Sequence, residues 1–374
     1  MKIAIAGNYG AKNLGDEMIL EGLIKTLKST DPDVEITVLS ADPEETKKKH
    51  GVKAVQKFPA GIRSAVKSML GEGGKTKKAV KECDYFILGG GGLFSNLTRK
   101  AYLIWGIQAR RALRYKKPLI MYGQSVGPVE GKFRKKLIKK LFNKAVFTAV
   151  RDIESKEELK RLGVKGKIHL IPDLVFYSDN EKKETSTQKE KKKKKIIVCP
   201  RQIGGSEGEL KDDFKEKVAD FLNWLIDEKK YKIVFANFQT PEDEILSKEL
   251  KERIGKKEEV KILSPFKSSK AAYETFSEAD FVLGMRLHSI LTAIKTETPF
   301  IAINYAPKVK NFLEYTKLKD LIVETSSPDF KNKFKEVSEQ KEKIIERLRI
   351  FNEQSKKRHE EIIKELAKTL ERKT

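Results

Sequence analysis

The stretch Phe-Val-Leu-Gly-Met-Arg-Leu-His-Ser-Ile-Leu-Thr-Ala-Ile, residues 281–294, contains the change from a strand to a helix. The apolar run before Arg286 predicts a buried strand, and the apolar spacing from Ser289 onward predicts a helix. If the backbone is still extended at Arg286, its side chain and that of His288 share one face, with Leu287 buried opposite. A helix N-terminus favours anions, because its free N–H groups and its dipole point there. A second role for His288, an interior histidine that donates to a backbone carbonyl, stays open.

Strand-like apolar runs alternate with amphipathic helical stretches along the chain, which is typical of parallel α/β sheets. In the first half the predicted strands are residues 2–7, 34–39, 85–89, 119–122, 146–150 and 168–171. In the second half they are residues 196–199, 232–236, 260–263, 281–283 and 300–303. Residues 178–195 are polar, end in a lysine run and predict an exposed linker. We therefore expect an α/β protein with two Rossmann-like domains that face a cleft, residues 1–177 and 196–330. A long helical segment, 331–374, follows them.

Composition narrows the class of partner. The 374 residues include 78 Lys and Arg against 54 Asp and Glu, a formal net charge of +24. Anionic partners are expected, whether nucleic acid, phosphorylated metabolites or an acidic membrane face, and the charge alone does not choose among them. No zinc-finger, helix-turn-helix or RNP pattern is present. Cys83 and Cys199 show no metal-ligand spacing, which predicts neither a disulfide framework nor a zinc site and fits a reducing cytoplasm. We expect no signal peptide and no spanning helix.

The loops after the strands are informative, because ligands of open α/β sheets collect outside the carboxyl ends of the strands. The first is Gly-Asn-Tyr-Gly-Ala-Lys-Asn-Leu-Gly-Asp-Glu, residues 7–17, which matches neither the dinucleotide fingerprint nor a P-loop. Asp16 opens the following helix, either as an N-cap or as a general base aimed into the cleft, and both roles stay open. Gly89–Gly92 predict backbone that a ligand can touch directly. Tyr122–Pro128 predict a small-residue turn, and Asp152 a helix cap.

Cationic side chains also follow several strands. They are Arg201, Arg286, Lys308 and Arg151. Cations that converge on one cleft repel one another unless an anionic ligand compensates them. A small ligand with both a phosphate and a carboxylate suits such a set, because guanidinium groups bind planar oxyanions in a forked geometry.

Six motifs together, in order, resemble the polysaccharide pyruvyl transferase family, which includes the cell-wall enzymes of S-layer bacteria. They are Gly-Asn-Tyr-Gly with Asn-Leu-Gly-Asp-Glu (7–10, 13–17), Gly-Gly-Gly-Gly-Leu-Phe (89–94), Gly-Gln-Ser-Val-Gly-Pro (123–128), Arg-Asp (151–152), Arg-Leu-His-Ser (286–289) and Asn-Tyr-Ala-Pro-Lys (304–308). The resemblance implies a fold similar to the GT-B glycosyltransferases and an enzyme without metal or cofactor. Its co-substrate would be phosphoenolpyruvate, whose pyruvyl carbons are moved onto a sugar as a cyclic ketal with release of phosphate.

The resemblance also implies roles for residues. Asp16 would be the base and His288 the acid on opposite walls of the cleft. The phosphoenolpyruvate-binding set would be Arg201, Arg286, Lys308 and Leu287. The remaining cleft residues would be Arg151, Asn13, Gly90, Gly91, Gln124 and Ser289. The acceptor would be a sugar of a cell-wall or polysaccharide precursor, lipid-linked in the S-layer branch and met at the cytoplasmic face of the membrane.

Two rival functions remain at this point. One is a GT-B glycosyltransferase that uses a nucleotide sugar, and the other is a non-enzymatic basic protein that binds nucleic acid or another polyanion. Peripheral membrane contact is also an expectation, because Lys132–Lys144, and more weakly Phe58–Leu70, read as basic amphipathic helices. The alternative, which we favour, is a solvated helix whose apolar side packs on the sheet.

Overall fold

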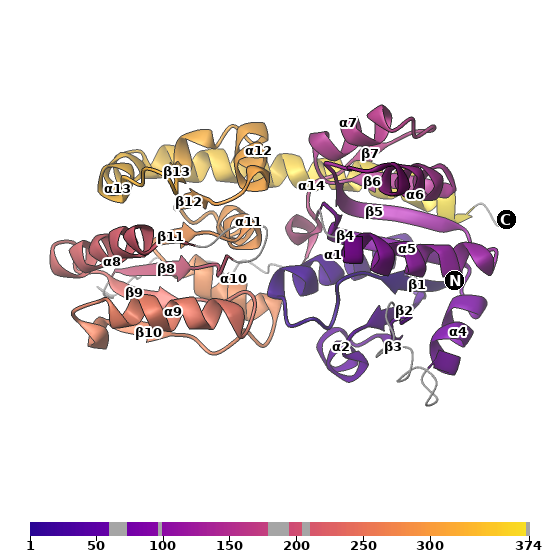
Figure 1. Cartoon of the computed structure of the whole chain (residues 1–374), viewed down its shortest axis with the longest axis horizontal. Helices are drawn as coiled ribbons and strands as arrows, with labels where there is room; N and C mark the ends of the chain where they lie inside the picture. Colours follow the sequence, from indigo (N-terminus) through magenta and orange to yellow (C-terminus); the bar gives the residue numbers. More distant parts are fainter. Residues whose placement is uncertain (60–72, 96–98, 179–193, 204–209, 372–374) are drawn as a thin grey trace. The chain divides into compact units, whose positions relative to one another are not determined.

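In the computed structural model, residues 1–59, 73–95, 99–178, 194–203 and 210–371 are described. The chain forms two compact units, here unit 1 (Met1–Ser178 with Ser355–Thr374) and unit 2 (Asp179–Gln354). Each is built on a parallel sheet with helices between its strands (Figure 1). The predicted linker lies almost wholly outside the described residues, as does most of the predicted helix Phe58–Leu70.

Unit 1 contains a seven-stranded sheet in the order β3-β2-β1-β4-β5-β6-β7. Its elements in chain order are β1 Lys2–Ala6, α1 Leu14–Thr30, β2 Glu35–Ser40, α2 Pro43–His50, β3 Lys53–Gln56, α4 Gly73–Glu82, β4 Tyr85–Phe94, α5 Arg99–Arg114, β5 Leu119–Val126, α6 Lys132–Asn143, β6 Ala145–Val150, α7 Ile153–Arg161, β7 His169–Leu170 and the 3₁₀ turn η2 Leu174–Tyr177. The six strands predicted for this half are all present. The structure adds β3. This strand has only four residues, two of them polar, so it does not form an apolar run that would have predicted a strand.

The two faces of this sheet are covered by different helices. On one face α4, α5, α6 and α7 supply a core that includes Val80, Trp105, Ile138 and Leu159. On the other face α1 packs against β4 and η2, and α14 joins it where Thr26 and His359 approach to 3.0 Å. Right-handed crossovers produce this arrangement, because the chain winds from β1 toward one edge and from β4 toward the other.

The glycine tract differs from its prediction. Gly89–Gly92 do not form a loop, because β4 continues through them to Phe94, with a register shift against β5 between Gly91 and Phe94. Three of the four glycines, Gly89, Gly90 and Gly91, are buried. A Cβ on Gly90 would lie 2.0 Å from Cγ2 of Ile19, so the missing side chain lets α1 pack directly on the strand. The predicted turn at Tyr122–Pro128 is likewise mostly strand, since β5 extends to Val126.

Unit 2 contains a six-stranded sheet in the order β10-β9-β8-β11-β12-β13. Its elements are β8 Lys195–Cys199, α8 Asp212–Asp227, β9 Lys232–Phe235, α9 Glu242–Glu252, η4 Lys257–Glu259, β10 Val260–Ile262, α10 Ser269–Ser277, β11 Phe281–Gly284, α11 Leu287–Lys295, β12 Phe300–Asn304, α12 Pro307–Tyr315, η5 Lys319–Leu321, β13 Ile322–Glu324, α13 Phe330–Glu339 and α14 Lys341–Glu371. All five predicted strands are present, and β13 is the one that the sequence did not indicate.

The predicted C-terminal helical segment is two helices, α13 and α14. In α13, Phe334 packs against Phe221 and Trp224 of α8. The last part of α14, from Ser355, belongs to unit 1, where the His359 ring stacks on Tyr177 at 4.3 Å between centroids. None of the helices in the described part of the chain combines the length and apolar character that crossing a bilayer requires.

The glycine contact with α1 can be tested by two substitutions at positive φ. Gly90→Ala is expected to lower the free energy of unfolding by about 2–5 kcal/mol, since it adds both left-handed strain and a clash with Ile19. Gly51→Ala, at the C-cap of α2, has a similar φ but open space around the added methyl group. It should cost only about 1 kcal/mol. Urea denaturation measures both, and equal losses would contradict the packing explanation.

Candidate functional site

The loop after β1 places Asp16 in the first turn of α1. The N-cap of this helix is Asn13, whose Oδ1 accepts hydrogen bonds from the backbone N–H groups of Gly15 and Asp16. Asp16 is therefore inside the helix, and of its two roles considered from sequence the structure gives the cap to Asn13. The Asp16 carboxylate is left to accept a hydrogen bond from Nδ2 of Asn8 at 2.8 Å.

The Asp16 carboxyl group has a raised pKa. The residue is only 9% exposed, and burial is the largest cause that raises its pKa from 3.8 to about 6. The hydrogen bond from Asn8 lowers this pKa, the neighbouring Glu17 raises it, and Arg151 and Lys57 lower it. A carboxyl group with a pKa near 6 is ionised at neutral pH yet accepts a proton more readily than an exposed aspartate.

Glu17 fixes the loop that holds Asn8. Its Oε1 accepts the backbone N–H of Gly10 at 2.9 Å, and its Oε2 lies 2.7 Å from Nε2 of His50. Both side chains of the Glu17–His50 pair are less than one-tenth exposed. The pair therefore ties the β1–α1 loop to the end of α2.

Two cations lie near Asp16. Lys57 follows β3 at the same carboxyl edge, and burial lowers its pKa while Asp16 and Glu17 raise it. Arg151 follows β6, and its guanidinium donates to Asp173 at 2.6 Å and to Oγ of Ser125 at 2.6 Å. A carboxylate of this chain therefore already compensates Arg151. Asp152 caps α7, as predicted, by accepting the N–H of Ser155.

The glycines and glutamine predicted for the cleft serve the same edge. A Cβ on Gly91 would lie 3.1 Å from Oδ1 of Asp16, so this glycine leaves room for the carboxylate. Gln124 is fully buried, and its Nε2 donates to the carbonyl of Leu88. Its Oε1 has no hydrogen-bond partner among the described residues. Asp16, Asn13, Gly90, Gly91, Gln124 and Arg151 thus belong to one edge of unit 1.

In unit 2 the strand register aligns the other predicted residues. Gly284 of β11 pairs with Cys199 of β8 on one side and with Ala302 of β12 on the other. Two residues further along each strand come Arg201, Arg286 and Asn304. Three neighbouring strands therefore deliver their following loops to one edge, the parallel-sheet position at which ligands bind.

The helix after β11 begins earlier than predicted. Arg286 is still extended, with φ −77° and ψ 138°, but α11 begins at Leu287 instead of Ser289. Leu287 is consequently half-buried, not buried as strand alternation would require, and His288 lies half-buried in the first turn. Ser289 is fully buried, with its hydroxyl donating to the carbonyl of Arg286 at 2.7 Å.

Arg286 is held by a carboxylate that sequence reasoning did not identify. Its Nε and Nη2 donate to the two carboxylate oxygens of Asp243 at 2.5 and 2.6 Å. Asp243 is fully buried in the first turn of α9 and also accepts the backbone N–H of Gln239 at 2.9 Å. Arg286 therefore requires no external anion for charge balance and orients the start of α11.

Arg201 and Lys308 come together on an aromatic ring. The guanidinium carbon of Arg201 lies 4.4 Å from the ring centroid of Tyr305, and Nζ of Lys308 lies 5.2 Å from it. The ring attracts both cations and keeps them close despite their mutual repulsion. This pair, together with the first turn of α11, is the strongest candidate anion site of unit 2.

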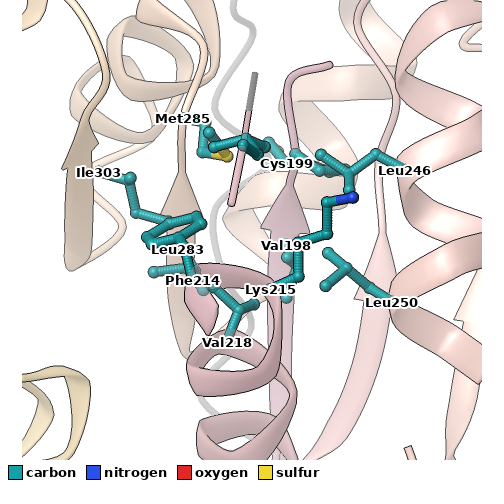
Figure 2. Close-up of a pocket in the computed structure, with 12 residues that line it drawn as sticks. Val198, Cys199, Phe214, Lys215, Val218, Leu246, Leu250, Leu283, Met285 and Ile303 are labelled. Atoms are coloured by element: carbon teal, nitrogen blue, oxygen red, sulfur yellow. The ribbon is translucent and has the colours of Figure 1, made fainter. Parts of the chain in front are cut away.

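A separate pocket in unit 2 does not suit an anion. It lies among β8, β11, α8 and α9 and is lined mainly by apolar side chains, among them Val198, Val218, Leu246 and Leu283 (Figure 2). A phosphate or carboxylate placed there would lose its hydration, and the lining cation Lys215 is already paired with Glu249 at 2.8 Å. Within the described residues, no group of three His, Cys, Asp or Glu side chains is placed to hold a metal ion.

Sequence reasoning missed Asn8, Glu17, His50, Lys57, Tyr305 and Asp243. Asn8, Glu17 and Tyr305 lie inside the quoted motifs, so their proximity to the predicted residues was a usable signal. Lys57 directly follows β3, so it could have been identified only if that strand had been predicted. For His50 and Asp243 the sequence carries no local signal, because their partners lie 33 and 43 residues away.

The buried charge at Asp16 should destabilise the fold. Its pKa is raised on folding, so this group favours the folded state at low pH and loses that contribution as the pH rises toward and through about 6. Asp16→Asn should therefore raise the free energy of unfolding at pH 8 by about 1–3 kcal/mol. The gain should shrink as the pH approaches 4. Asp33→Asn, an exposed control, should change little in urea denaturation, and an equal gain at pH 4 and pH 8 would contradict a charge effect.

The Arg286–Asp243 pair should be a structural requirement. Arg286→Ala leaves a buried carboxylate without compensation and is expected to lower the free energy of unfolding by about 3–5 kcal/mol. Arg349→Ala removes an arginine from an exposed pair with Glu346 and should cost at most about 1 kcal/mol. Thermal unfolding compares the two, and a stable Arg286→Ala protein would show that the pair does not hold this edge.

Comparisons with known proteins identify relatives of the chain and the fold that it shares with solved structures. The chain is 22% identical to the amylovoran biosynthesis protein AmsJ of Erwinia amylovora, over 87% of this chain and 89% of that protein. Among solved structures, UDP-GlcNAc 2-epimerase from Neisseria meningitidis bound to UDP-GlcNAc aligns with a TM-score of 0.64 at 12% identity, over 98% of this chain and 100% of that chain. Anabaena HepE in complex with UDP and glucose gives a TM-score of 0.61 at 12% identity, over 98% and 100%. These likenesses show the GT-B-like fold.

The family model for polysaccharide pyruvyl transferase matches residues 13–307, which include Asp16, the glycine tract, and the loops that follow β8, β11 and β12. The match covers most of the chain, and the expected transferase class and role in polysaccharide biosynthesis are confirmed with it. The chain is therefore a member of the polysaccharide pyruvyl transferase family.

Proposed function

We propose that the protein transfers the pyruvyl carbons of phosphoenolpyruvate to a sugar of a polysaccharide precursor, forming a cyclic ketal and releasing phosphate. Family membership supports pyruvyl transfer. The observation that carries the finer proposal is the cluster of Arg201, Tyr305 and Lys308, which lies at the same edge of the unit 2 sheet as His288. Phosphoenolpyruvate has a carboxylate and a phosphate, the two anionic groups that such a pair of cations can hold.

The reaction needs one base and one acid. A first sugar hydroxyl adds to C2 of phosphoenolpyruvate while C3 gains a proton and becomes the methyl group. A second hydroxyl of the same sugar then attacks C2, and phosphate leaves. Two C–O bonds form, the bond to phosphate breaks, and two hydroxyl protons end on the methyl carbon and on phosphate.

Asp16 and His288 suit these proton transfers. The carboxyl pKa of about 6 supports a role for Asp16 as the base that removes a hydroxyl proton. His288 would supply a proton to the substrate or its leaving phosphate. In this proposal unit 1 binds the acceptor and unit 2 binds the donor.

Gln124, Ser289 and Leu287 have supporting places in this proposal. Gln124 is buried in β5, where it pairs with Gly91 of β4, while Ser289 and Leu287 belong to the first turn of α11. The dipole of α11 favours an anion at this end of the helix. No metal or cofactor is required by these steps, since the donor carries its own leaving group.

The acceptor we propose is a saccharide carried on a lipid at the cytoplasmic face of the membrane, as in the S-layer branch of the family. A lipid-borne acceptor confines the enzyme to a surface, which favours peripheral contact with anionic lipid. Nucleic acid has no part in this proposal.

The decisive experiment measures phosphate release from phosphoenolpyruvate with lipid-linked and soluble saccharide acceptors. Wild-type protein should release phosphate only when the acceptor is present, and a new ketal should appear in the product by mass spectrometry. His288→Ala and Asp16→Asn should each lower kcat at least about 100-fold, the scale of one general acid or base. Asp16→Asn should still bind phosphoenolpyruvate in calorimetry, because the donor set lies in unit 2.

Asp33→Asn serves as the control and should keep full activity. Consumption of a UDP-sugar with no turnover of phosphoenolpyruvate would replace this proposal with the glycosyltransferase alternative. Normal phosphate release by His288→Ala would remove its role as the acid.

A further inference from the structure

The apolar face of the basic helix α6 is buried. Leu137, Ile138, Leu141 and Phe142 are buried against the sheet. Most of α6 is therefore a solvated helix whose apolar side packs on the sheet, the alternative that the sequence favoured. Phe133, the second residue of α6, is the exception, because it is 62% exposed.

A second exposed apolar side chain lies on the neighbouring helix. Leu103, near the start of α5, is 46% exposed. The two helices run side by side in parallel. The Arg134 guanidinium lies 5.6 Å from the Tyr102 ring, and one turn later Leu137 fills the space beside Gly106. Leu103 and Phe133 flank the first of these contacts in sequence, so both belong to the N-terminal ends of the helix pair.

The N-terminal ends of α5 and α6 lie at the same edge of the unit 1 sheet as Asp16. α5 follows β4 and α6 follows β5, as α1 follows β1, so all three helices begin at the carboxyl ends of the strands. Lys57 connects the two regions, because its Nζ lies 5.3 Å from the Trp105 ring of α5 and its charge acts on Asp16.

The helix pair is strongly cationic. Neither α5 nor α6 contains an aspartate or glutamate. The cations of α6 are Lys132, Arg134, Lys135, Lys136, Lys139 and Lys140, and all but Arg134 are exposed. Glu130 and Glu158 act on Tyr102 from outside the two helices, so the surface is predominantly and not uniformly basic. Exposed aliphatic and aromatic side chains within a predominantly basic surface are the features by which peripheral proteins bind an anionic bilayer.

We propose that the N-terminal halves of α5 and α6, which carry Leu103 and Phe133, form a docking surface for an anionic phospholipid bilayer. Phe133 and Leu103 enter the boundary of the acyl chains, and the lysines of α6 contact headgroup phosphates. The helices dock by these halves and not along an amphipathic face. This contact brings the acceptor edge of unit 1 to the membrane, and only that consequence rests on the proposed function.

Two features favour lipid over nucleic acid or a protein partner. Leu103 offers no ring on which a base could stack, and it gains nothing at a phosphate backbone. A protein partner would have to be uniformly acidic to match helices without a single carboxylate. A bilayer of anionic lipid supplies both the negative charge and the apolar layer beneath it.

The test is co-sedimentation of the full chain with vesicles of phosphatidylglycerol and phosphatidylcholine at 0.1 M salt, with pure phosphatidylcholine vesicles as reference. The wild-type chain should bind the anionic vesicles at least tenfold more tightly. Phe133→Ser with Leu103→Ser should weaken this binding about tenfold or more, and Lys132→Glu with Lys136→Glu should do the same. Glu is well tolerated at the start of a helix, so the second pair should not unfold α6.

Matched controls lie in unit 2. Ile245→Ser removes another exposed apolar side chain, and Lys335→Glu with Lys343→Glu makes the same change of charge. These variants should bind vesicles as the wild-type chain does. Equal losses in test and control pairs, no preference for anionic vesicles, or a polyanion competitor whose binding also depends on Phe133 and Leu103 would overturn the proposal.

Measurements of phosphoenolpyruvate turnover test the docking surface independently of the proposed pyruvyl transfer. The Phe133→Ser/Leu103→Ser protein should turn over phosphoenolpyruvate with a soluble saccharide as the wild-type chain does, and lose turnover only with a vesicle-borne acceptor. Vesicle binding without any turnover of phosphoenolpyruvate would refute the pyruvyl transfer and leave the docking surface standing.

Discussion

The hydrogen-bond register of parallel strands is the constraint on which both candidate edges depend. Every strand runs the same way, so whatever follows its last residue is delivered to one side of the sheet. In unit 2, Gly284 sits level with Cys199 and Ala302, and the residues two positions later become neighbours. In unit 1 the same rule brings the loop after β1, the end of β4 and the loop after β6 around Asp16. Residues far apart in the chain therefore share one chemical environment.

The cationic side chains at these two edges make two different kinds of contact. Arg286 and Arg151 are each compensated by a buried carboxylate, Asp243 and Asp173. Arg201 and Lys308 both lie against the ring of Tyr305, which attracts cations. The first kind of contact fixes backbone segments, and the second gathers two cations around one aromatic ring. Counting arginines in the sequence could not separate the two.

Much of the fold followed from the sequence, because the alternation of buried strands with amphipathic helices is a local pattern. Eleven predicted strands, the residues at strand ends and the cap at Asp152 were accessible in this way. The departures have physical causes. The glycine tract was expected to be a loop, but it is strand because α1 packs directly on it through Ile19. The start of α11 at Leu287 and the Asp243 partner of Arg286 depend on tertiary contacts. The raised pKa of Asp16 also needs the three-dimensional structure, since burial is its main cause.

The division of α14 between the units has a consequence for how the chain is made. Unit 1 is discontinuous, since the segment from Ser355 supplies His359 and Leu366 to its interior. Unit 2 is one uninterrupted stretch and can fold as soon as it leaves the ribosome. Unit 1 begins first but must wait for the part of α14 synthesised after unit 2 before its hydrophobic interior is closed. During translation, the older half of the nascent chain is therefore the one whose hydrophobic core is completed last.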